Sequence, residues 1–142
     1  MERLSFLVSR RRDIFFAPMA SVLYVDDEPA MRQAVHLWLS THGVEAHAAK
    51  NVASAKRSLA LHPDIVGAFI DIWLGDGSGF ELYAWIEEHR PALVDRVIFV
   101  TGDVVAAPAA DQIAALGRPV ITKPFDLEEL AEQARAWGAG KG

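Results

Sequence analysis

The sequence predicts an α/β fold, a three-layer sandwich in which helices cover both faces of a five-stranded parallel sheet. Five short apolar runs alternate along the chain with five stretches in which apolar residues recur at helical spacing. One of these runs, DIVGAFIDIWL, is continuous enough to be a strand buried on both faces. Alternating strands and helices favour parallel pairing through right-handed crossovers.

The first two strand–helix units are marked by residues suited to helix ends. SVLYVDD (residues 21–27) predicts the first strand, and VEAHAA (residues 44–49) predicts a second, weaker one. Pro29 suits the first turn of a helix, where its missing N–H would have no partner, and Gly43 can end that helix in a left-handed conformation. Asn51 is a favourable N-cap for the next helix.

The second half of the chain continues the same alternation. The expected elements are a strand over residues 64–74, a helix over 80–89, a strand over 95–102, a helix over 103–117, a strand over 118–124 and a helix over 126–138. The stretch GDGSG between the first two of these is predicted to be a loop. Pro108 kinks the fourth helix or delays its start, and Asp126 caps the last one.

Five strands in this arrangement favour the flavodoxin-like (βα)5 order 2-1-3-4-5. The first and third strands are then neighbours, about 5 Å apart. The polar residues at the strand ends are Asp26 and Asp27 on the first strand, Asp71 on the third, Thr101 on the fourth and Lys123 on the fifth. Because open α/β sheets bind ligands at the carboxyl ends of their strands, we expect a functional site at this edge.

The residue types at this edge favour phosphoryl chemistry. Three carboxylates suit a hard cation such as Mg²⁺, which would offset the repulsion within VDDE. A carboxylate can attack phosphorus to form an aspartyl-phosphate, with Lys123 supplying a cation and Thr101 a hydroxyl to the phosphoryl oxygens. Each residue alone has an ordinary interpretation, as a solvated strand end, a locally bonded threonine or a surface lysine. Their joint occurrence at successive strand ends is the stronger observation.

Four motifs, VLYVDDEP, FIDIWLGDGSGFEL, VIFVTGD and RPVITKPF, resemble in order and spacing the receiver (CheY-like) domain of bacterial two-component response regulators. The resemblance covers about residues 20–138. It implies that Asp71 accepts a phosphoryl group from a sensor-kinase histidine. It also implies that Thr101 is the switch hydroxyl and that Lys123 pairs with the phosphate.

The same resemblance implies a metal site and a backbone feature. Asp27, Asp71 and the backbone carbonyl of Trp73 would bind Mg²⁺, and Asp26 would assist through water. The bond between Lys123 and Pro124 would be cis, as is typical of the family.

Three positions depart from the common pattern of this family. Val120 stands where an aromatic residue usually moves together with the switch hydroxyl, which puts that coupling in doubt. The loop after Asp71 contains glycines in place of the usual proline. Trp73 is bulky and either shields a phosphorylated Asp71 from water or folds back into the core.

The resemblance further implies how a signal would leave the domain. The partners would be a sensor histidine kinase or histidine phosphotransfer protein and a downstream protein that reads the face formed by the fourth helix, the fifth strand and the fifth helix. Val104, Val105 and Trp137 are expected on that face, with Trp137 either a packing residue or a binding anchor. The chain would be a monomer or a phosphorylation-dependent homodimer. It would be no enzyme beyond catalysing its own phosphorylation and dephosphorylation.

Several alternatives remain beside this interpretation. No helix-turn-helix pattern follows the last helix, so we expect a stand-alone receiver without DNA-binding or other output domain. A phosphorelay intermediate or a phosphate sink for a hybrid kinase is an alternative, and a receiver excised from a longer chain would look the same. A further alternative is a receiver-like binding scaffold that is not phosphorylated. All five key positions are nevertheless intact, namely Asp26, Asp27, Asp71, Thr101 and Lys123. A phosphatase of the haloacid dehalogenase type is disfavoured because VDDEP lacks the DxD spacing of its nucleophile.

Composition bounds the remaining possibilities. The absence of cysteine excludes disulfides and thiolate sites and fits a cytoplasmic location. The net charge of −5 argues against direct nucleic-acid binding, and no apolar run approaches the ~20 residues of a membrane span. We expect a receiver domain over residues 20–138 and a short tail over residues 139–142. Residues 1–19 would be a poorly ordered extension, a basic targeting or membrane-surface segment, or a mis-assigned start before Met19.

Overall fold

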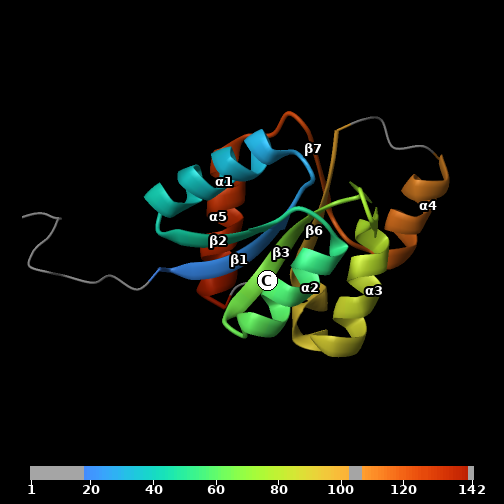
Figure 1. Ribbon diagram of the computed structural model, residues 1–142, viewed down its shortest axis with the longest axis horizontal. Coiled ribbons are helices and arrows are strands. Elements are labelled where there is room, and N and C mark those ends of the chain that lie inside the picture. Colours follow the sequence, from blue (N-terminus) through green and yellow to red (C-terminus); the bar gives the residue numbers. More distant parts are fainter. Residues whose placement is uncertain (1–17, 103–106, 141–142) are drawn as a thin grey trace, which may run out of the picture.

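The computed structural model describes residues 18–102 and 107–140 (Figure 1). The elements are β1 (Ala20–Val25), α1 (Pro29–Thr41), β2 (Val44–Ala49), α2 (Val52–Leu61), β3 (Ile65–Asp71), β4 (Trp73–Leu74), β5 (Gly77–Ser78), α3 (Gly79–His89), the 3-10 helix η1 (Pro91–Arg96), β6 (Val97–Thr101), α4 (Ala107–Leu116), β7 (Val120–Thr122) and α5 (Leu127–Gly138). The extension predicted over residues 1–19 lies, apart from its last two residues, outside the described ranges, as do Val104, Val105 and the end of the predicted tail. No helix within the described ranges is long and apolar enough to cross a membrane.

The main sheet has the predicted architecture. Its strand order is β2-β1-β3-β6-β7, and all four pairings are parallel. Because β6 and β7 are its fourth and fifth strands, this is the flavodoxin-like order 2-1-3-4-5. Helices α1 and α5 cover one face, and α2, α3 and α4 cover the other (Figure 1). A separate apolar core fills each side of the sheet.

Three predicted helix ends are confirmed by their hydrogen bonds. The Asn51 side chain accepts a hydrogen bond from the Ser54 amide, and the Ser54 hydroxyl accepts one from the Asn51 amide, which closes a capping box at α2. The Asp126 carboxylate accepts the Glu128 amide at the start of α5. Gly43 follows α1 with a φ of 79°, the left-handed conformation that favours glycine.

The structure differs from the prediction around two turns. The third strand ends at Asp71, and Trp73–Leu74 pairs instead with Gly77–Ser78 in a two-residue hairpin where a plain loop was expected. The fourth strand of the sheet begins at Val97, because η1 occupies the residues from Pro91 onward. Proline suits the first position of such a helix because it has no N–H to satisfy.

The core beneath α5 contains Trp137, whose side chain is only 2% exposed. Its ring lies 5.1 Å from that of Phe69, between centroids, and it packs directly over Gly67 of β3. The interpretation of Trp137 as an exposed binding anchor is therefore wrong. A tryptophan on an amphipathic helix can face either way, and here the strand opposite has a glycine that leaves room for it.

This contact predicts a large effect of a small change. A methyl group at Gly67 would overlap the Trp137 ring, so we expect Gly67→Ala to lower the free energy of unfolding by ~1–3 kcal/mol. The matched control is Gly75→Ala, because a Cβ at Gly75 would have no atom within 4 Å. Urea denaturation measures both variants, and equal midpoints for the two would contradict the packing described.

Candidate functional site

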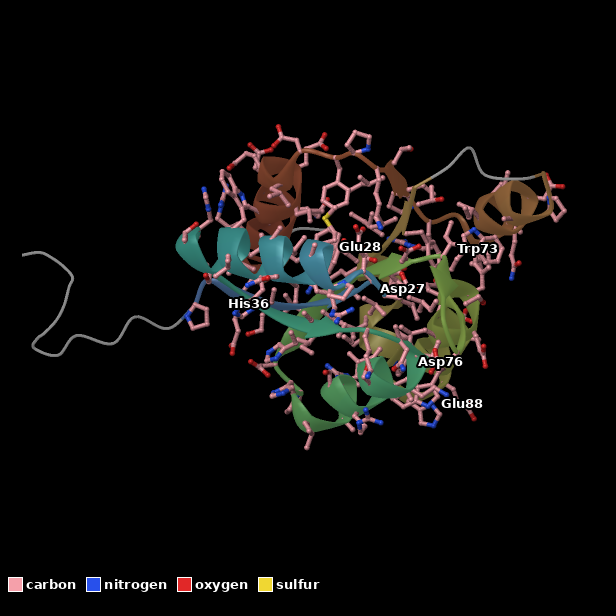
Figure 2. The ribbon with its side chains drawn as sticks, turned by 45° about the horizontal axis from the view of Figure 1, so that its top comes forward. Asp27, Glu28, His36, Trp73, Asp76 and Glu88 are labelled. Carbon is pink, nitrogen blue, oxygen red and sulfur yellow. The ribbon has the colours of Figure 1, made fainter. Side chains whose placement is uncertain are left out.

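The polar residues predicted at the strand ends lie together at one edge of the main sheet. Asp26 and Asp27 follow β1, Asp71 ends β3, Thr101 ends β6 and Lys123 follows β7. Figure 2 shows the edge, with Asp27 and Trp73 on it. One oxygen from each of the three aspartates lies within 4.8 Å of the others. The parallel topology thus brings together carboxylates that lie 45 residues apart in the chain.

Lys123 joins two of these carboxylates. Its Nζ is 2.8 Å from Asp26 Oδ2 and 3.2 Å from Asp71 Oδ2. Its backbone is held in place because the Lys123 amide donates a hydrogen bond of 2.7 Å to the carbonyl of Thr101. Burial alone would lower the pKa of Lys123, but hydrogen bonds and charges from Asp26 and Asp71 raise that pKa above its ordinary value. The ammonium group is therefore a fixed positive charge in the site.

Asp26 is fully buried and has several partners. Its carboxylate accepts hydrogen bonds from the Tyr24 hydroxyl at 2.8 Å and from the Glu28 amide at 3.0 Å, in addition to the Lys123 ion pair. Arg32 donates to the Asp26 backbone carbonyl. Burial, and then the charge of Asp26, raise the pKa of Tyr24, so its hydroxyl stays protonated as a donor. The repulsion among adjacent acids that a cation was expected to offset is therefore partly offset by the chain itself.

Asp71 is held between a cation and a backbone donor. The Trp73 amide donates to Asp71 Oδ1 at 3.2 Å, while Lys123 contacts the other oxygen. Burial raises the pKa of Asp71, and the charge of Lys123 together with the Trp73 hydrogen bond limits that rise. With 7% of its surface exposed, Asp71 is buried but still open to solvent.

Two of the unusual positions in the sequence lie on the surface of the protein. The Trp73 side chain is 59% exposed, so the alternative that it folds back into the core is wrong. Val120 lies at the start of β7 and is also exposed. Thr101, by contrast, is buried at the end of β6.

The donor set fits a hard divalent cation. Three carboxylate oxygens are available, and no described nitrogen or sulfur ligand belongs to this cluster. Asp27 is exposed, which leaves open coordination positions for water, and Mg²⁺ prefers an incomplete set of oxygen ligands of this kind. A cation here would also reduce the cost of ionising the buried Asp71 carboxyl.

Two residues that support the site, and one that fixes a neighbouring helix, were not predicted. Tyr24 could have been found, because residues two apart on a strand point to the same face and Asp26 lies two residues on. Arg32 lacked such a signal, since its partner is a backbone carbonyl. Asp76, in the β4–β5 turn, accepts the amides of Val52 and Ala53 at the start of α2. No local pattern links a turn to a helix that starts 24 residues earlier.

Comparisons with known proteins agree on one family. The family model of the response regulator receiver domain matches residues 22–135. The chain is 33% identical over 110 residues to the response regulator protein PilR of Pseudomonas aeruginosa, covering 78% of this chain and 24% of PilR. It is 30% identical over 119 residues to the transcriptional regulatory protein KdpE of Mycobacterium tuberculosis, covering 83% of this chain and 50% of KdpE. The chain thus spans half or less of the length of these two relatives.

A solved structure shows the same fold. The crystal structure of a response regulator receiver protein from Pseudomonas putida superposes with a TM-score of 0.71. It is 29% identical to this chain and covers 84% of it, and the match extends over 97% of the putida protein.

Proposed function

Because this chain belongs to the family of response regulator receiver domains, we propose that it is a phosphorylation-dependent switch of a two-component system. The observation that supports this most strongly is the contact of Asp71 with both Lys123 and the Trp73 amide, beside two further carboxylates. Phosphorylation would come from a histidine of a sensor kinase or of a histidine phosphotransfer protein.

The proposed transfer moves a phosphoryl group from nitrogen to oxygen. An Asp71 carboxylate oxygen attacks phosphorus, the bond between phosphorus and the donor imidazole breaks, and the imidazole leaves with the electron pair. Lys123 then pairs with the phosphoryl oxygens, and the Thr101 hydroxyl donates to one of them. Asp27, Asp71 and the Trp73 carbonyl, with Asp26 assisting through water, would hold Mg²⁺, which would supply further positive charge.

The same contacts can operate a two-state switch. Lys123 is tied to Asp26 and Asp71 in this structure, and a phosphoryl group on Asp71 gives it a more highly charged partner. Each charged contact is worth ~1.5–3 kcal/mol, and a shift from 1:99 to 99:1 needs ~5.5 kcal/mol. About two to four new contacts would therefore supply the free energy of such a shift.

The face expected to carry the signal has a groove between the sheet and α5. Its volume is about 450 Å³, and it is lined by Ile98, Ile121, Glu129, Glu132, Gln133 and Ala136. Apolar residues of β6 and β7 form its floor and acidic residues of α5 its side. A downstream protein with an apolar side chain and a basic rim would suit this groove. A relay role would use the same site with a second histidine as acceptor, and a phosphate-sink role would use it with water as acceptor.

Phosphorylation by a small-molecule phosphodonor tests the proposal. The wild-type protein is incubated with acetyl phosphate and Mg²⁺, beside Asp71→Asn, and intact mass is measured. We expect one phosphate adduct that needs Mg²⁺ and is absent from the variant. Size exclusion of the same samples reports whether phosphorylation produces a dimer. If neither acetyl phosphate nor a phosphohistidine protein gives an adduct, the non-phosphorylated scaffold becomes the better interpretation.

Trp73 is predicted to lengthen the life of the phosphorylated state. Its backbone amide contacts Asp71 and its side chain is exposed, so the ring is placed to hinder the approach of water to the phosphorus. We expect Trp73→Asn to lose its phosphate several-fold faster than wild type, as followed by intact mass after removal of the donor. An equal or slower rate in the variant would show that Trp73 does not shield the site.

A further inference from the structure

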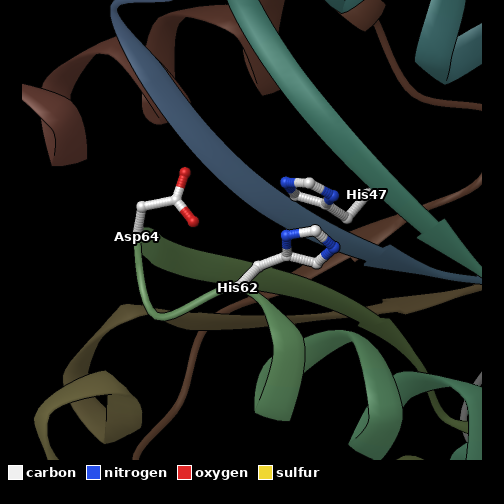
Figure 3. A group of neighbouring side chains, drawn as sticks. All are labelled: His47, His62 and Asp64. Atoms are coloured by element: carbon white, nitrogen blue, oxygen red, sulfur yellow. The ribbon is translucent and has the colours of Figure 1, made fainter.

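A second cluster of ligating side chains lies away from the carboxylate edge. His47 lies in the middle of β2, His62 follows the last residue of α2, and Asp64 directly precedes β3 (Figure 3). One ligand atom from each lies within 4.8 Å of the others. Asp71 ends the strand that begins after Asp64, so the two clusters lie ~20 Å apart along β3, as the rise per residue indicates.

The two imidazole rings stack, and both present a nitrogen to the same side. Their centroids are 4.0 Å apart and their planes differ by 23°. Figure 3 shows one nitrogen of each ring turned toward the Asp64 carboxylate. Stacked rings direct their lone pairs side by side, so one ion can bind both nitrogens only when the rings tilt toward it. His62 is half-buried and directly follows α2, outside the regular helix.

His47 has a polar atom that the described structure does not satisfy. Its Nε2 is buried and accepts or donates no hydrogen bond. The nearest acid on its own strand, Glu45, has an oxygen 3.9 Å away, too far for a hydrogen bond. An unpaired buried polar atom costs free energy, so ring stacking alone does not explain the arrangement. Burial and the neighbouring His62 lower the pKa of His47, which keeps the imidazole in its neutral, ligating form.

Ser21 lies beside the two acids near these rings, Glu45 and Asp64. The Ser21 hydroxyl donates to Glu45, and a hydrogen bond with Ser21 lowers the pKa of Asp64. The single O–H of Ser21 can donate to only one of these carboxylates at a time, so Ser21 can orient one of them, as hydrogen-bond partners around a metal site do. Two imidazoles and one or two carboxylates form the tetrahedral nitrogen and oxygen set that Zn²⁺ prefers, whereas Mg²⁺ prefers oxygen alone.

We propose that His47, His62 and Asp64 form a binding site for a divalent transition-metal ion such as Zn²⁺, with water completing the coordination. The ion would join β2, the end of α2 and the start of β3. It would be separate in place and in chemistry from the cation at the carboxylate edge.

Calorimetric titration with Zn²⁺ in the presence of excess Mg²⁺ tests this site, because the proposed function has Mg²⁺ compete for the carboxylate edge. Wild type is compared with His62→Ala and Asp64→Asn, and with His89→Ala as a control on an exposed histidine outside the cluster. We expect one ion per chain, bound at least ~10-fold more weakly by the two cluster variants and with unchanged affinity by the control. Zn²⁺ should also shift the ring NMR signals of His47 and His62 and raise the melting temperature of the wild-type protein.

Two results would overturn the proposal. One is the absence of Zn²⁺ binding by the wild-type protein in both titration and melting. The other is equal affinity of His62→Ala, Asp64→Asn and His89→Ala. Asp71→Asn separates this proposal from the phosphorylation proposal, because that variant is expected to keep its Zn²⁺ affinity while losing the phosphate adduct. Asp64 is exposed, so Asp64→Asn decides the outcome if His62→Ala does not fold.

Discussion

Replacement of Lys123 by methionine is expected to lower the free energy of unfolding at neutral pH, without metal, by about 3 kcal/mol. Lys123 is the cation that contacts both Asp26 and Asp71, and the Asp26 side chain is almost completely buried. Methionine has a similar length and no charge, so the variant leaves two buried carboxylates without their ion pair. Urea denaturation in EDTA measures the loss.

The carboxylates also predict how the stability of Lys123→Met depends on Mg²⁺. Mg²⁺ should stabilise Lys123→Met more than it stabilises the wild-type protein, because the cation replaces part of the missing charge. Lys50→Met is the matched control, since Lys50 is exposed, and its unfolding free energy should stay within ~0.5 kcal/mol of wild type. If Lys123→Met and Lys50→Met unfold alike with and without Mg²⁺, Lys123 does not balance the charges of this site.

Trp137→Ala is expected to lower the free energy of unfolding by ~3–5 kcal/mol, the usual cost of truncating a buried tryptophan. The side chain lies in the core between α5 and the sheet, against Phe69 and Gly67. Its loss would leave a cavity whose walls are strands that cannot collapse far. Urea denaturation of the variant tests this, with Trp137→Phe expected to keep a larger part of the stability.

Trp38→Ala provides the comparison for a surface tryptophan. The Trp38 ring is partly exposed on α1 and stacks on His42, so its loss should cost no more than ~1 kcal/mol. Unchanged stability of Trp137→Ala would contradict the buried position of this residue and restore its interpretation as a binding anchor.

The sequence predicted the sheet well because local sequence features mark its strands and the helices between them. Continuous apolar runs, a proline after the first strand and capping residues at Asn51 and Asp126 are local features, and each one matches an observed element. The strand order followed from the number of units and the handedness of crossovers, which brings Asp26 and Asp71 to adjacent strands.

What the sequence did not predict depends on contacts between distant segments. The sequence left Trp137 as either a packing residue or a binding anchor, because its burial depends on a glycine 70 residues earlier. The Asp76 cap of α2 depends on a hairpin that follows Asp71. The ion pair of Lys123 with Asp26 could likewise be seen only in the structure. Periodicity predicts the face on which a residue lies, but not the residue it contacts. Both histidines of the second cluster lie in ordinary positions of the sequence, and the stack between them appears only when β2 and α2 pack.

The most direct test of the central claim is to locate the phosphoryl group chemically. The protein is phosphorylated with acetyl phosphate and Mg²⁺ and then reduced with borohydride, which converts an aspartyl phosphate to homoserine, and peptide masses identify the residue changed. The proposal predicts homoserine at position 71 and nowhere else. Reduction at Asp26 or Asp27, or a phosphate that survives borohydride on a histidine or hydroxyl side chain, would contradict it.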